Sequence, residues 1–143
     1  MTRAELLAFL RRYRIAVEAT AGSDGMPQAA VVGIAVSDEL EVIFDTLANT
    51  RKYANLRANP RIALVVGWED EATAQIDGVA HFPEGEALER ARDCYLSVYP
   101  DGRERLEWSG ITHVVVKPEH VRFSDFARTP PLFAEFGPDE LAR

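Results

Sequence analysis

Residues 43–52 have the sequence IFDTLANTRK, and they join a strand to a helix. The apolar residues Val42–Phe44 predict a strand, and Thr50–Lys52 predict the first turn of a helix. This junction gathers free backbone N–H groups, a partial positive charge, a hydroxyl and two cationic side chains. Such a place favours an anion, and a phosphate best of all. We therefore predict an anion site here, and we interpret the rest of the chain as its scaffold.

The same residues have a simpler interpretation, which is a solvated start of a helix. The helix dipole disfavours cations at this end. Arg51 and Lys52 are adjacent there, and Asp45 is the nearest carboxylate in the sequence. Two cations in an unfavourable place indicate that an anion is expected, so we prefer the functional interpretation.

Around this segment the sequence predicts a mainly β protein with flanking helices. Gly22–Gly25 forms a turn between two strands, and Gly78 marks a bulge or close approach. Short turns between successive strands imply an antiparallel sheet, and closure into a small barrel would remove its edges. The predicted strands are 15–20, 27–36, 41–45, 61–66, 72–82, 112–116 and 120–124, and the helices are 2–13, 51–58 and 86–99.

The length and composition indicate one soluble domain. The chain has 143 residues, which form a single domain over 1–143, with an arm from about 126 to 143 that we expect to lie on a neighbouring subunit. The net charge of −7 argues against nucleic acid and against an anionic membrane surface. The single cysteine, Cys94, allows no internal disulfide. With no signal peptide or membrane segment predicted, we expect a cytoplasmic protein that binds a small molecule.

Familiar enzyme motifs are absent from the sequence. There is no H-E-x-x-H, C-x-x-C, G-x-S-x-G, G-x-G-x-x-G or Walker loop. His81, His113 and His120 each stand alone in a strand pattern, which is more typical of packed side chains than of catalysts. We predict no metal site and assign no catalytic residue. Any redox chemistry would then belong to a bound cofactor.

Three pieces of sequence in this order resemble the pyridoxamine 5′-phosphate oxidase-like family of FMN-binding split β-barrels. They are Gly25–Pro27, Phe44–Lys52 and Asn59–Leu64. The likeness continues through Gln75 and Gly78–Ala80, and more weakly through Tyr95–Asp101. The resemblance implies a split antiparallel barrel, a homodimer, and two cofactor sites at the dimer interface.

The resemblance also implies roles for particular residues. Asp45 and Thr46 would lie along the flavin, while Thr50, Arg51 and Lys52 would meet the FMN phosphate and ring. Gln75 matches a glutamine that contacts FMN. Val31 and Val32 match a strand whose backbone runs beside the isoalloxazine.

Three departures from the family pattern limit what the resemblance implies. Ala30 stands where the best-known enzymes of the family carry a phosphate-binding arginine, and Tyr99 replaces a substrate-binding arginine. The C-terminal extension of the true oxidases, with its Trp and Arg, has no clear match. Oxidation of pyridoxamine phosphate itself is therefore not expected.

Three functions fit these expectations. The first is a flavin-dependent oxidoreductase that moves electrons between a nicotinamide or oxygen and an unidentified small molecule. The second keeps the fold but binds a deazaflavin coenzyme, a choice that Ala30 leaves open. The third is a non-catalytic flavin carrier or sensor.

Overall fold

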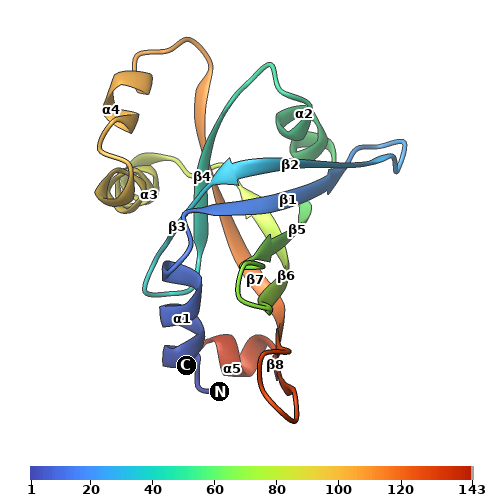
Figure 1. Cartoon of the computed structure of the whole chain (residues 1–143). Coiled ribbons are helices and arrows are strands. Elements are labelled where there is room, and N and C mark those ends of the chain that lie inside the picture. The colour runs from blue at the N-terminus through green and yellow to red at the C-terminus, as the bar shows by residue number, and fades with distance from the viewer. Residues whose placement is uncertain (143) are drawn as a thin grey trace.

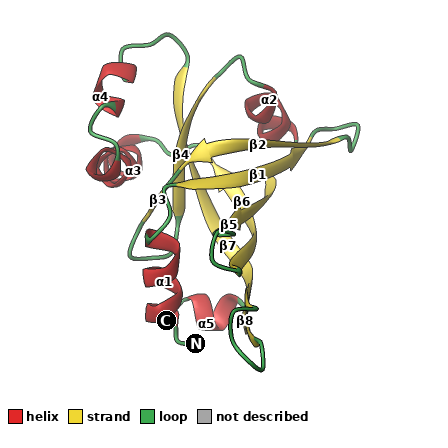
Figure 2. Cartoon of the chain, viewed as in Figure 1, coloured by secondary structure: helices red, strands yellow, loops and turns green. Residues whose placement is uncertain are grey.

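The computed structural model describes residues 1–142, and its centre is a curled antiparallel sheet with helices around it (Figures 1 and 2). Eight strands form the sheet in the order β2-β1-β5-β6-β7-β4-β3, and β8 pairs with β7 outside this path. The strands are β1 (Ile15–Ala21), β2 (Pro27–Gly33), β3 (Ala35–Val36), β4 (Val42–Leu47), β5 (Arg61–Val66), β6 (Ala72–His81), β7 (Ile111–Asp125) and β8 (Leu132–Phe136). The helices are α1 (Arg3–Arg11), α2 (Arg51–Ala58), α3 (Gly85–Val98), α4 (Gly102–Arg105) and α5 (Pro138–Leu141).

The two ends of this strand order are consecutive in the chain. Only Ile34 separates β2, which pairs with β1, from β3, which pairs with β4. The segment from Pro27 to Val36 therefore crosses from one edge of the sheet to the other and closes its path. The split antiparallel barrel predicted from the sequence is confirmed, whereas the homodimer stays a prediction.

The core fills the inside of this sheet. Phe44, Leu64, Ile76, Val114 and Val116 are almost completely buried there. Alternation along each strand directs one set of side chains inward and leaves the other on the outer face. Burial of each such side chain contributes roughly 1.5–3 kcal/mol. These contacts fix β4, and with it the start of α2.

The helices cover different parts of the barrel (Figure 1). A capping box formed by Thr2 and Glu5 begins α1, which lies near α5. α3 and α4 lie together on one side, and α2 on another. With 14 residues α3 is the longest helix, and no helix within residues 1–142 is long and apolar enough to cross a bilayer.

The structure corrects the prediction of two strands at 112–116 and 120–124. They are one continuous strand, β7, and Lys117–Glu119 is not a turn. Pro118 is tolerated because it lies between the part of β7 that pairs with β4 and the part that pairs with β8. On the β6 side the register shifts between Asp77 and Gly78, so the predicted bulge at Gly78 is confirmed.

Three of the helices and strands were not predicted from the sequence. The tail contains β8, which pairs with β7 of the same chain, and α5. The short helix α4 follows α3 and directs Arg105 toward β4. All three depend on contacts with distant parts of the chain.

Candidate functional site

Thr50 joins β4 to α2 and begins the candidate site. It caps α2: its Oγ1 accepts a hydrogen bond from the Tyr53 N–H at 3.3 Å and donates one to the Leu47 carbonyl at 2.9 Å. The hydroxyl of Thr46 lies 2.9 Å from that of Thr50. The first turn of α2 has no acidic residue. The helix therefore begins with a fixed hydroxyl pair and with no acidic side chain in its own first turn to neutralise its positive end.

A cavity of about 360 Å³ opens beside this helix start. It is lined by Glu18, Gln28, Ala29, Ala30, Asn49, Thr50, Arg51 and Lys52. The Gln28 side-chain oxygen, when turned toward Arg51, accepts from its Nε at 2.7 Å. Within residues 1–142 neither Arg51 nor Lys52 forms an ion pair with a carboxylate. No ion pair in this part of the chain therefore neutralises either cation, so the charge of both is available to an anion.

The structure thus brings together four of the residues predicted from the sequence, Thr46, Thr50, Arg51 and Lys52. Thr50, Arg51 and Lys52 line the cavity, and Thr46 supports it through Thr50. At Ala30 the cavity wall carries only a methyl group, so no cation comes from β2 at that point.

Asp45 points to the other side of β4 and is already paired. Its Oδ2 accepts from Arg105 Nε at 2.9 Å, and its Oδ1 accepts from the Tyr95 hydroxyl at 3.2 Å. His113 is its partner in register on β7 and is buried. Burial lowers the pKa of His113, and the hydrogen bond to Asp45 raises the pKa of Arg105. Asp45 therefore holds α3 and α4 against the barrel.

Val31 and Gln75 lie on the outer face of the sheet. Cross-strand pairing places Val31, Val17, Val65 and Gln75 in one row across β2, β1, β5 and β6. Val31 is 64% exposed and Gln75 is exposed, while Val32 faces the core. These three predicted residues therefore lie apart from the lining of the α2 cavity. The three valines of this row are apolar, so their burial by a second protein surface would be favourable.

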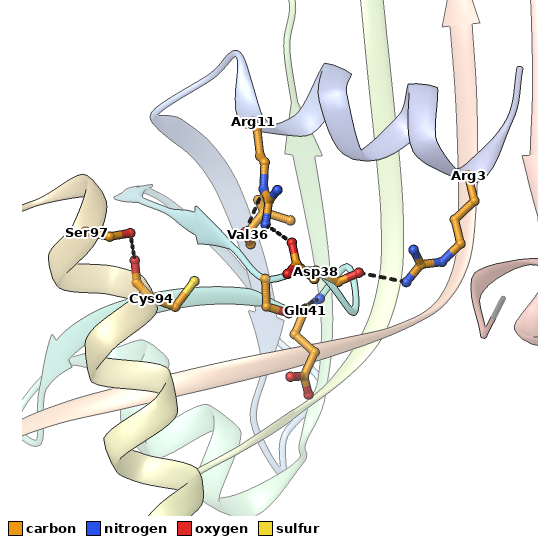
Figure 3. A network of polar contacts seen from close by, with 8 residues as sticks. Arg3, Arg11, Val36, Asp38, Glu41, Cys94 and Ser97 are labelled. Carbon is orange, nitrogen blue, oxygen red and sulfur yellow. Dashed lines mark hydrogen bonds and ion pairs between the residues drawn. The ribbon is translucent and has the colours of Figure 1, made fainter.

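A second cavity, of about 580 Å³, lies between α3 and the β3–β4 turn. Two of its charged groups, Arg11 and Asp38, bind each other, as Figure 3 shows. Arg11 donates to the Val36 carbonyl at 3.0 Å and to Asp38 at 2.8 Å. Burial raises the pKa of the Cys94 thiol, which keeps it protonated and a poor nucleophile. Three carboxylates, from Asp38, Glu39 and Glu41, line this cavity, so it suits an anion less well than the cavity at α2.

Glu18, Tyr95 and Arg105 were not predicted from the sequence as members of these polar groups. Glu18 had a detectable signal, because it is the one charged residue among the inward positions of β1. Arg105 had none, since 60 residues separate it from Asp45.

Comparison with known proteins identifies the family. A sequence model described as pyridoxamine 5′-phosphate oxidase matches residues 2–125. The chain belongs to the pyridoxamine 5′-phosphate oxidase family. It is 35% identical over 94 residues to the pyridoxine/pyridoxamine 5′-phosphate oxidase of Rubrobacter xylanophilus, a match that covers 65% of this chain and 42% of that one.

Solved structures share the fold of this family member. The heme binding protein from Mycobacterium smegmatis has a TM-score of 0.83 and 20% identity, over 99% of this chain and 60% of that one. A pyridoxamine 5′-phosphate oxidase-related, FMN binding protein from Nostoc punctiforme has a TM-score of 0.73 and 11% identity, over 98% and 91%. The chain spans 42% and 58% of the length of the two curated oxidases it matches.

Proposed function

We propose that this protein is an FMN-binding oxidoreductase that acts on a small molecule other than pyridoxamine phosphate. The observation that carries the proposal is the pair of cations Arg51 and Lys52, neither of which forms an ion pair within residues 1–142, in a cavity at the start of α2. The FMN phosphate would lie in this cavity. The flavin supplies the redox chemistry, and the protein binds and orients it.

The chemistry of the cavity matches a phosphate monoester. Such a group carries close to two negative charges and three strong acceptor oxygens. Arg51 and Lys52 donate charge-assisted hydrogen bonds, and the exposed N–H groups of the first turn of α2 add further donors. The net charge of the chain is −7, so these two side chains form a local exception in a mainly acidic protein.

The outer sheet face supports a homodimer as part of this proposal. Val31 is largely exposed, and its neighbours Val17 and Val65 in the same row are only partly buried. A second copy of the chain covering this row would bury apolar surface. It would also bring Gln75 to an interface, where the family resemblance expects the flavin ring. A nicotinamide and the small-molecule substrate would then reach the ring from the solvent side.

The test is a titration with FMN followed by flavin fluorescence. Each hydrogen bond from a charged group contributes roughly 1.5–3 kcal/mol. Changing Arg51 and Lys52 together to Ala should therefore weaken FMN binding on the order of 10²-fold or more. Unchanged FMN affinity in this double variant would refute the site.

The matched control is Arg61→Ala on β5. Arg61 is 62% exposed and pairs with Glu119 at 3.0 Å, and it does not line the α2 cavity. This variant removes one surface cation and leaves every residue that lines the cavity unchanged. Its FMN affinity should equal that of the unaltered protein.

Ala30 favours a second candidate function on the same scaffold. Without a cation from β2 at this point, the cavity would bind a phosphate less tightly, which suits a deazaflavin coenzyme whose contacts are spread over a longer tail. Titration with a deazaflavin coenzyme beside FMN separates the two. Tighter binding of the deazaflavin would replace the first proposal with the second.

A further inference from the structure

Glu18 is a fully buried carboxyl group. Within residues 1–142 neither of its side-chain oxygens has a hydrogen-bond partner. Burial of an unpaired carboxylate is costly, and nearly all buried polar groups in folded proteins are paired. A buried carboxyl group of this kind indicates a binding role, in which a ligand supplies the missing hydrogen-bond partner.

Glu18 lies on the inward face of β1, beside α2. Ala16, Glu18 and Thr20 are the inward residues of β1, and Thr20 accepts a hydrogen bond from Asn55 of α2 at 3.1 Å. The face of β1 that carries Glu18 is therefore packed against α2. Glu18 also lines the cavity that Arg51 and Lys52 share.

The neighbouring elements leave Glu18 with little compensating charge. On β2 its register partner is Ala30, and on β5 it is Leu64, neither of which titrates. On α2 the charged groups at the cavity are Arg51 and Lys52. Burial raises the pKa of Glu18, and Lys52 only partly opposes this. Ala30 carries only a methyl group, so β2 brings no cation to Glu18 at this point.

An anion in this cavity would meet Glu18 in one of two states. An ionised carboxylate would repel a phosphate and would compete with it for Lys52. A neutral carboxylic acid would instead donate its O–H to a phosphate oxygen, and the orphaned group would gain a partner.

Building on the proposed function, we propose that Glu18 is a binding residue for the phosphate. It holds the ligand as a neutral acid, and its ionised form takes up one proton from solvent when the anion binds. Glu18 thereby makes the cavity selective for a phosphate oxygen that accepts a hydrogen bond.

The test compares FMN affinity in the unaltered protein and in Glu18→Gln from about pH 6.5 to about pH 9, above the second phosphate pKa of about 6. Once Glu18 is ionised in the free protein, affinity should fall toward roughly tenfold per pH unit. The Gln amide keeps a donor and cannot titrate, so this variant should bind FMN with little dependence on pH. Glu69→Gln makes the same change at an exposed turn and should retain the pH dependence.

Infrared spectroscopy of the FMN complex gives a second measurement that holds even if Glu18 stays neutral over this whole range. The complex should show a carboxylic-acid C=O band that Glu18→Gln lacks. Equal pH dependence in both proteins without the carboxylic-acid band, or an ionised Glu18 in the complex, would overturn the role of Glu18 alone. Failure of FMN to bind the unaltered protein at any pH would overturn both this role and the proposed function.

Discussion

Arg105 should stabilise the fold through Asp45, and its replacement by Ala tests whether Asp45 has a structural role. Arg105 Nε lies 2.9 Å from Asp45, and its Nη2 lies 3.3 Å from the Tyr95 hydroxyl. The side chains of Arg105 and Asp45 are only 22% and 16% exposed. The ion pair of Arg105 with Asp101 adds little to the stability of the fold, because Asp101 is 68% exposed.

The magnitude follows from what the substitution leaves behind. Arg105→Ala strands one carboxylate oxygen of Asp45 in a mostly buried place. Breaking a fully buried pair costs about 3–5 kcal/mol, and partial exposure reduces this to about 2–3 kcal/mol here. For a chain of this size, that loss lowers the melting temperature by roughly 4–12 °C.

A double-mutant cycle with Asp45→Asn, read by urea denaturation, isolates the pair. In the Asp45→Asn background, Arg105→Ala should cost less than about 1 kcal/mol, because no stranded charge remains. Arg103→Ala, an exposed arginine on the same helix, is the control and should change stability little. Equal costs of Arg105→Ala in both backgrounds would refute the structural role of Asp45.

Two further predictions concern stability. Gly78→Ala should destabilise the fold by about 1–3 kcal/mol in urea denaturation, because an added Cβ would lie 2.6 Å from the Lys117 carbonyl oxygen at the bulge; a loss no larger than that of the exposed Asp77→Ala would contradict this reasoning. Glu18→Gln should stabilise the ligand-free protein increasingly as pH rises, because the raised pKa of Glu18 makes the folded state bind more protons than the unfolded state, so that this residue's destabilising effect appears above its unfolded pKa of about 4.3. Unfolding free energies of the two proteins that stay parallel from acidic to neutral pH would rule this out.

Local patterns in the sequence were enough for much of the fold. The capping box at Thr2 and the bulge at Gly78 each depend on a few neighbouring residues or on one residue type. Thr50 could likewise be predicted as the start of α2, since a hydroxyl there caps the helix. The cluster of Thr50, Arg51 and Lys52 is contiguous in the chain, so its collection at one cavity needed no long-range information.

The remaining features depend on contacts between distant segments. Pro118 lies within β7 only because no strand pairs with it on the β4 and β8 side, and local sequence cannot show this. The side chain of Asp45 reaches Arg105, which lies 60 residues away, so this ion pair could not be predicted from local sequence. The predicted contact of Asp45 with the flavin stays a prediction. Glu18 stands out in the sequence as the one charged inward residue of β1, but its place beside the cavity depends on the packing of α2 against that face.

The most direct test of the central claim is the ratio of FMN to riboflavin affinity, since the two ligands differ only in the phosphate. The account places that phosphate against Arg51, Lys52 and the first turn of α2. Two charged hydrogen bonds predict that FMN binds on the order of 10²-fold more tightly than riboflavin, and that the ratio collapses in the Arg51→Ala, Lys52→Ala double variant. Equal affinities for the two flavins in the unaltered protein would contradict the account.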